Sequence, residues 1–230
     1  MAYPVRLRVQ RAEHYSRLTT FFRGIMVIPH LIWLIGYSIA AAFVTLYAWF
    51  AILGKGAYPK GALEWQERYL RYVSRVGAFY WLLTDSFPPF HGRDEEDAYP
   101  NVSYSIERTE HLSRTTTALR VPGVITNVLT RIHPIFFLVE LYLLPANIVA
   151  AFLFVFGWLV SIVAWFAILI TGRFPATLFE LIELPFRYGL RVASFSNLVT
   201  DRYPWFQPES EQGNVPSPDW DQPLPPPSVA

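Results

Sequence analysis

Two long apolar runs dominate the pattern of hydrophobic and polar positions along the chain. The first, residues 24–53, is 30 residues long and contains His30 as its only Asp, Glu, Lys, Arg or His residue. The second, residues 132–171, is longer. One helix needs only ~20 residues to cross the hydrocarbon, and both runs have basic residues on each side, which favour the cytoplasmic face. We therefore expect a helical hairpin in each run. The first hairpin has its tip near residues 36–38, and one long tilted helix is the alternative for that first run.

Each apolar run is followed by a charged, amphipathic stretch, residues 62–83 and 178–199. In both stretches two glutamates and two arginines are spaced three, four and four apart, which places them along one helical face. These positions are Glu64, Glu67, Arg71 and Arg75, and Glu180, Glu183, Arg187 and Arg191. Aromatic and apolar residues fill the other faces. The pattern predicts a helix in the membrane interface whose charged ladder faces water or a partner.

These features recur because the chain is an internal duplication. The segment AWFAIL at residues 48–53 returns 116 positions later, at 164–169, and the match continues to Phe90 and Phe206. A second match, offset by 97, pairs the EHxSR element at 13–17 with the one at 110–114, and Arg23 with Arg120. The second copy therefore holds 19 extra residues between its two matching blocks.

A short segment with alternating apolar residues precedes each EHxSR element. The alternating positions are Val5, Leu7 and Val9, and Val102, Tyr104 and Ile106. Period two indicates strands, which we expect to pair with each other. The predicted fold is mainly α and membrane-integral: a first membrane repeat at 1–90, an acidic linker at 91–101, a second membrane repeat at 102–206 and a disordered, Pro-rich tail at 207–230.

The composition agrees with a membrane protein. Hydrophobic residues make up 53% of the chain, aromatic residues 17% and charged residues 16%, a more apolar balance than that of an average soluble domain. A net charge of +1 gives no field that would favour nucleic acid. The absence of cysteine excludes disulfides, thiolate nucleophiles and cysteine-ligated metals. We predict no cofactor and no metal site.

The four arginines of the charged ladders allow two interpretations. In the functional one, Arg71, Arg75, Arg187 and Arg191 bind lipid phosphates, because a guanidinium group matches phosphate geometry. In the structural one, they pair with the glutamates of their own helix. Recurrence in both copies fits either interpretation.

Other polar residues are assigned structural roles. His14 and His111 would have to converge to share a metal, so a structural role for the EHxSR elements before a membrane helix is preferred. Asp85 and Asp201 precede proline in TDSFPPF and TDRYPWF, which indicates a helix end and turn; a buried ion pair with Arg75 or Arg191 is the alternative. We assign no catalytic residue.

The apolar run ending in WFAIL, the G-x-x-P break, the RY-x-x-R-V helix and the T-D-x-x-P-x-F end resemble the bacterial membrane family called domain of unknown function 4389. The resemblance covers residues 3–90 and 99–206, in a tandem arrangement. It implies a small inner-membrane protein near envelope or lipid metabolism. It carries over no activity, cofactor or catalytic residue.

The sequence therefore predicts a multi-pass protein of the bacterial inner membrane with cytoplasmic termini. Its expected function is that of a non-enzymatic scaffold or accessory subunit whose partners are membrane lipids and either another membrane protein or a second copy of itself. The alternative is an enzyme or carrier for lipid-linked substrates at the cytoplasmic face. That alternative would use His14, His111, Asp85 and Asp201, which would have to converge in space.

Overall fold

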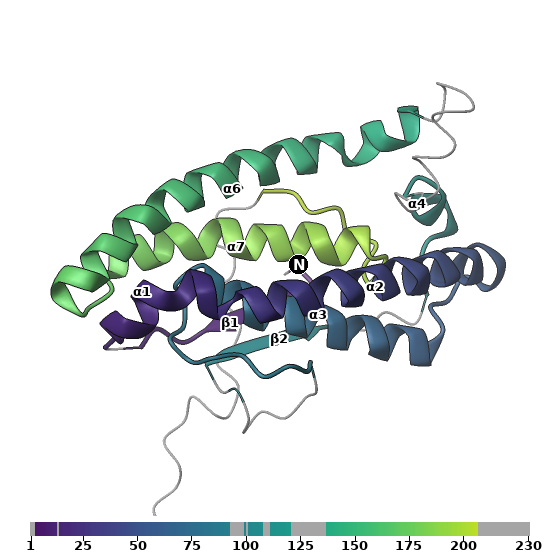
Figure 1. The fold of residues 1–230 in the computed structure, drawn as a ribbon. Coiled ribbons are helices and arrows are strands. Elements are labelled where there is room, and N and C mark those ends of the chain that lie inside the picture. Colours follow the sequence, from purple (N-terminus) through teal and green to yellow (C-terminus); the bar gives the residue numbers. More distant parts are fainter. Residues whose placement is uncertain are drawn as a thin grey trace, which may run out of the picture.

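The computed structural model describes residues 3–12, 14–92, 99, 101–107, 111–120 and 137–206, with side chains from residue 142 onward in the last segment. The predicted tail at 207–230 and most of the acidic linker lie outside these residues. In chain order the elements are β1 (Val5–Val9), α1 (Arg17–Met26), α2 (Ile28–Lys55), α3 (Lys60–Tyr80), β2 (Val102–Ile106), α4 (Arg114–Ala118), α6 (Phe137–Thr171) and α7 (Ala176–Ser196) (Figure 1).

Each copy contains one long apolar helix, which is followed after a turn by a second helix. Helix α2 ends at Gly56 and α6 ends at Gly172, and both glycines adopt positive φ, 72° and 70°. A left-handed residue at this position closes a helix with little strain only when it lacks a Cβ. Pro59 and Pro175 then directly precede α3 and α7. The G-x-x-P segments of the sequence therefore form the turns of two helical hairpins, one between α2 and α3 and one between α6 and α7.

The prediction of a hairpin within each apolar run is wrong. Residues 36–38 lie inside the continuous helix α2, and the described part of the second run is the single helix α6, which passes through Pro145. One long helix, the alternative considered for the first run, is observed there, and the described part of the second run also forms one long helix. An isolated glycine such as Gly36 does not end a helix, and a turn would expose backbone groups that an apolar environment leaves without partners. Pro29 stands at the start of α2, where its missing N–H costs no helical hydrogen bond.

The two predicted strands form and pair with each other. They are antiparallel, and Leu7 lies opposite Tyr104. Leu7 and Tyr104 are also counterparts under the offset of 97, so the pairing is symmetric about this point. The two copies are thus related by a pseudo-two-fold axis that passes through the strand pair.

The helices of the two copies run in opposite directions about this axis. In Figure 1, α2 starts at the end of the molecule where α6 finishes, and α3 and α7 are likewise opposed. Helices α3 and α7 contact each other where Gly77 lies against Phe186: a Cβ on Gly77 would stand 2.6 Å from the ring. The strand pair packs against α3 and α7 on one side.

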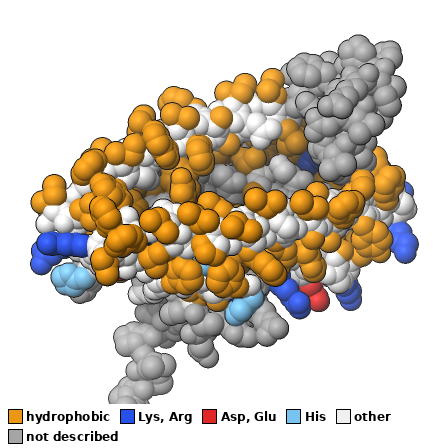
Figure 2. Space-filling model, viewed as in Figure 1, with side chains coloured by type: hydrophobic (Ala, Val, Ile, Leu, Met, Phe, Trp, Pro, Cys, Tyr) orange, Lys and Arg blue, Asp and Glu red, His pale blue; other side chains and the backbone are white. Residues whose placement is uncertain are grey.

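Helices α1, α2 and α6 carry a broad exposed apolar face (Figure 2). Helices α2 and α6 are long and apolar enough to cross a membrane. Only 17% and 22% of their most apolar stretches is buried inside the protein, whereas the core helix of a soluble protein would be largely covered. Large exposed side chains such as Ile39, Phe43 and Phe152 line this face.

Candidate functional site

A buried ion pair fixes α1 to the end of α3 in the first copy. Arg23 is 3% exposed, and its Nη2 donates to Asp85 Oδ1 at 2.9 Å. Its Nη1 donates to the carbonyl oxygens of Phe79 and Thr84, the latter at 2.8 Å, and the guanidinium lies 4.5 Å from the centre of the Phe79 ring. Asp85 Oδ2 accepts from the backbone N–H of Ser16 at 2.9 Å. The aspartate therefore joins the cation to the start of α1.

The second copy repeats this ion pair with equivalent residues. Arg120 is 2% exposed and pairs with Asp201, and its Nη1 donates to the carbonyl oxygens of Phe195 at 3.0 Å and Thr200 at 2.6 Å. Asp201 Oδ2 accepts from the backbone of Ser113. The buried aspartate–arginine pair is thus present, but with partners other than the predicted Arg75 and Arg191. Recurrence of Arg23 and Arg120 in the 97 offset was the available signal.

Burial and the carboxylate act in opposite directions on the arginine. Removal from water lowers the pKa of Arg23 to about 10, and the negative charge of Asp85 raises it. For Arg120 burial again lowers the pKa and Asp201 again opposes the shift. A pKa near 10 leaves Arg23 charged at neutral pH, so the ion pair persists there as a structural element.

Each EHxSR element begins a short helix and also caps a long helix of the other copy. Ser16 Oγ accepts from Thr19 N at 3.2 Å, which is an N-cap of α1. Tyr15 N donates to the carbonyl of Gly172 at 3.1 Å, and Arg17 Nη2 donates to the carbonyl of Ile170 at 3.0 Å. These carbonyls close α6, which belongs to the second copy. A cation at a helix C-terminus also interacts favourably with the helix dipole.

The second copy caps the long helix of the first copy in the same way. Leu112 N donates to the carbonyl of Gly56 at 3.0 Å, and Arg114 Nη2 donates to the carbonyl of Gly54 at 3.1 Å, so the second copy caps α2 of the first. The indole N–H groups follow the same rule, because Trp49 donates to Thr117 O and Trp165 to Thr20 O, both at 2.9 Å. A structural role for these elements is therefore observed, and the copies are interlocked.

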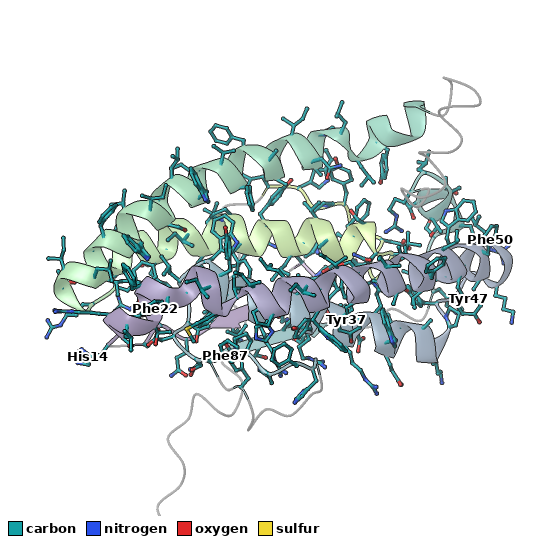
Figure 3. The ribbon with its side chains drawn as sticks, in the orientation of Figure 1. His14, Phe22, Tyr37, Tyr47, Phe50 and Phe87 are labelled. Atoms are coloured by element: carbon teal, nitrogen blue, oxygen red, sulfur yellow. The ribbon has the colours of Figure 1, made fainter. Side chains whose placement is uncertain are left out.

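The two histidines of the EHxSR elements do not converge. His14 lies at the α1 end of the molecule (Figure 3), whereas His111 directly precedes α4, which contacts the opposite end of α2. Within the described residues no group of three His, Cys, Asp or Glu side chains could hold a metal ion. Glu13 and Glu110 lie outside the described residues. The geometric condition for joint catalysis by the histidines is not met.

Most of the first charged ladder is buried rather than facing water. Glu67, Arg71 and Arg75 are 8%, 9% and 3% exposed, and only Glu64 at the start is exposed. Arg71 Nη1 donates to Gly92 O at 3.0 Å. The strand pair covers this face of α3, so the expected wet face is an internal one.

The second ladder follows the same plan with one visible ion pair. Glu183 and Arg191 are 9% and 7% exposed, whereas Glu180 is exposed. Arg187 Nη2 donates to Glu183 Oε1 at 2.7 Å, which confirms intrahelical pairing at this position. Arg191 lies 5.3 Å from the ring of Tyr3, as Arg75 lies 5.7 Å from that of Tyr99. Phosphate binding by the four arginines stays a prediction.

His30 occupies a buried aromatic pocket near the start of α2. Its Nδ1 is 2.7 Å from the Tyr72 hydroxyl, and its ring stacks on Phe90 at 4.0 Å, next to Phe87. The counterpart in the second copy is Ala146, which accepts from Tyr188 and donates to Tyr203 through its backbone. This histidine is thus specific to one copy.

Exposed basic residues lie beside the ends of the apolar face. Arg17 and Arg173 are exposed at one end, and Lys55 and Arg114 are exposed at the other. Basic side chains gather at both ends in Figure 2. We call these four residues the basic rim. Their common position at the ends of the apolar face follows from the contacts between the copies, such as those of Arg17 with Ile170 and of Arg114 with Gly54, and is not evident from the sequence.

Comparison with known proteins gives one family. No curated protein matches the chain, and no solved structure matches it. The family model "Domain of unknown function (DUF4389)" matches residues 17–91 and again residues 135–207. The two matched segments contain α2 and α3, and α6 and α7, and together cover more than half of the sequence. The chain therefore belongs to the DUF4389 family, of which it carries two copies in tandem.

Proposed function

We propose that the protein is a non-enzymatic membrane scaffold or accessory subunit that lies in the cytoplasmic leaflet of the inner membrane. Its exposed apolar face, formed by α1, α2 and α6, enters the acyl chains, and the strand pair on the other side faces the cytoplasm. The observation that carries the proposal is the presence of one broad apolar face (Figure 2) on the helices and of exposed polar residues on the strand pair, Arg6, Ser103 and Ser105.

The position of the strand pair favours helices that lie in the membrane plane over helices that cross it. The pseudo-two-fold axis passes through Leu7 and Tyr104, so the strand pair is at the middle of the molecule (Figure 1). If α2 and α6 crossed the bilayer, the exposed Arg6, Ser103 and Ser105 would lie at mid-depth. A charged side chain there costs at least ~2.5 kcal/mol, and an open sheet edge in lipid leaves backbone groups unsatisfied.

The distribution of charge supports the same orientation. Since α2 and α6 are antiparallel, a crossing arrangement would put Arg17 and Arg173 on one side of the membrane and Lys55 and Arg114 on the other. Equal positive charge on both sides gives no orientation signal. In-plane helices keep all four basic residues at one surface, where they contact anionic headgroups at about 1 kcal/mol per residue.

The enzyme alternative has less support from the geometry. His14 and His111 lie near opposite ends of the molecule, and Asp85 and Asp201 are each engaged by a buried arginine and a backbone N–H. These groups serve to hold the copies together. A scaffold requires only such a rigid, interlocked body with a membrane face and a cytoplasmic face.

Spin labels on two single-cysteine variants test this arrangement in anionic vesicles. Ile39→Cys on α2 is at a 57% exposed position of the apolar face, and Ser105→Cys is exposed on β2. We expect oxygen to relax the label at 39 and a water-soluble nickel complex to relax the label at 105. Oxygen access at both positions would indicate crossing helices, and nickel access at both would contradict membrane insertion.

The scaffold role has its own test. The protein isolated in mild detergent should retain anionic lipid or a membrane-protein partner. Repeated isolation of the protein free of both would contradict this role, even if the membrane orientation were correct.

A further inference from the structure

A groove of about 360 Å³ opens between α1, the end of α3 and α6. Its volume falls in the range of ~300–1,000 Å³ that is typical of ligand pockets. Five of the eleven residues that line it are aromatic, among them Trp81, Trp158 and Trp165. Trp158 is 48% exposed and belongs to the apolar face, so the groove opens toward the lipid in the proposed orientation. The inference below rests on that orientation.

Three hydrogen-bond donors line this apolar groove. Among the described residues, Thr20 Oγ1, Arg23 Nε and Ser161 Oγ are buried atoms without a hydrogen-bond partner. Thr20 and Arg23 are 0% and 3% exposed. A buried polar group without a partner costs about 1–3 kcal/mol, and such a group in a pocket indicates that a ligand supplies the missing partner.

The equivalent place in the second copy is satisfied by protein atoms. Thr45, the counterpart of Ser161, donates to Asn197 Oδ1 at 3.2 Å, and Arg120 Nε donates to Thr116 O at 3.1 Å. Asn197 is replaced in the first copy by Trp81, which has no oxygen to accept. Thr117, the counterpart of Thr20, also has no partner among the described residues. The difference between the copies therefore rests on Ser161 and Arg23.

The chemistry of the three donors defines the ligand. An Nε–H group only donates, so the ligand must present an acceptor. The Nη atoms of Arg23 are engaged by Asp85 and two carbonyls, and the charge of Asp85 already balances that of the guanidinium. A neutral acceptor therefore fits better than a phosphate. We propose that the groove holds one acyl chain of a membrane glycerolipid, with its ester carbonyl accepting from Ser161 and Arg23.

Two glycine substitutions provide a blocking variant and a matched control. Gly24 lines the groove, and a Cβ added there meets no atom within 4 Å, so Gly24→Phe should fill the groove without disturbing the fold. Gly36 is equally open and lies on α2 away from the groove. Ser161→Ala removes one donor and leaves the apolar walls unchanged.

The test uses vesicles containing a diacyl phosphatidylcholine with a photoreactive group in one acyl chain. We expect saturable cross-linking to the α1 and α6 peptides that line the groove. Gly24→Phe should reduce it at least fivefold, Ser161→Ala severalfold, and Gly36→Phe should leave it unchanged. An ether-linked analogue without the ester carbonyl should cross-link severalfold less than the ester lipid.

The outcomes separate the groove from the membrane orientation. Uniform, non-saturable cross-linking along α2 and α6, or full cross-linking in Gly24→Phe, would overturn the acyl-chain site while leaving the membrane face intact. Equal cross-linking by the ether lipid would overturn recognition of the carbonyl. Absence of cross-linking from the whole apolar face, α2 included, would contradict the proposed function itself.

Discussion

Neutralising one aspartate of the repeated ion pair should destabilise the protein strongly. In Asp85→Asn the guanidinium of Arg23 stays buried without a counter-charge. Removing one partner of a fully buried pair costs about 3–5 kcal/mol. The Asp85 side chain is 21% exposed and that of Arg23 is 4% exposed, so water screens part of the loss, and we expect about 2–3 kcal/mol. This is a large fraction of a typical total stability of ~5–15 kcal/mol.

The assay is urea unfolding of the purified protein in one mild detergent, followed by circular dichroism. Glu64→Gln is the matched control, because it removes the same charge at an exposed position and should change the free energy of unfolding by less than ~0.5 kcal/mol. Asp201→Asn should cost as much as Asp85→Asn, since its ion pair has similar exposures of 25% and 1%.

A double mutant tests whether the two partners stabilise the protein through one shared interaction. In Arg23→Met combined with Asp85→Asn, the loss should be smaller than the sum of the two single losses, because the partners share one interaction. A loss below ~0.5 kcal/mol for Asp85→Asn, or strict additivity in the double mutant, would show that the ion pair does not stabilise the interlocked copies.

Three further predictions concern packing, capping and pH. Gly157→Ala should destabilise the protein by ~1–3 kcal/mol, because the new Cβ would lie 2.5 Å from the ring of Trp81. Gly36→Ala is the control: its Cβ meets no atom within 4 Å, so the change should be neutral or stabilising. Thermal unfolding measures both effects. Arg17→Ala should lower stability by up to ~1 kcal/mol through loss of the α6 cap, and hydrogen exchange should increase at the end of α6. Burial raises the pKa of Tyr99 from 10.0 to about 12. The contribution of its neutral phenol to the free energy of unfolding is therefore complete below pH 10 and is lost as pH rises to 12. Tyr99→Phe should reduce the fall in stability over this pH interval, which unfolding measurements at several pH values would show.

The elements that depend on local pattern were predictable from the sequence. Period-two alternation identified β1 and β2 and their pairing, and the helical spacing of the charged residues identified α3 and α7. The duplication made both sets more certain, because each pattern occurs twice at a fixed offset. The apolar runs were predicted to be membrane helices, but a run of 30 residues such as the first fits one tilted helix or two short ones. The basic flanks of both runs led to the incorrect prediction of two helices in each.

The contacts between the copies were not predictable from local pattern. An offset of 97 shows that Arg17 and Arg114 are equivalent, but it does not show that each caps a helix of the other copy. The sequence suggested that Asp85 and Asp201 could each form a buried ion pair with an arginine. The suggested partners, Arg75 and Arg191, are near in sequence, whereas the observed partners, Arg23 and Arg120, are distant. The groove depends on a difference between the copies: the second copy has Asn197 where the first has Trp81. The sequence shows this difference, but only the structure shows that Asn197 accepts a hydrogen bond from Thr45 of α2 and that Trp81 lines the groove with Ser161 of α6.

The orientation of the helices in the membrane is the central claim, and the sidedness of two engineered cysteines tests it most directly. The chain has no cysteine of its own, so single variants give an unambiguous signal. His14 is exposed beside the end of α6, and Gly61 is exposed at the start of α3, near the opposite end of the molecule.

Intact cells carrying His14→Cys or Gly61→Cys are treated with a membrane-impermeant maleimide, before and after permeabilisation of the inner membrane. Helices that lie in the cytoplasmic leaflet keep both ends of the molecule on the same side. We therefore predict that neither cysteine reacts in intact cells and that both react after permeabilisation. Reaction of one cysteine from outside and the other only after permeabilisation would show that the helices cross the bilayer and would contradict the account.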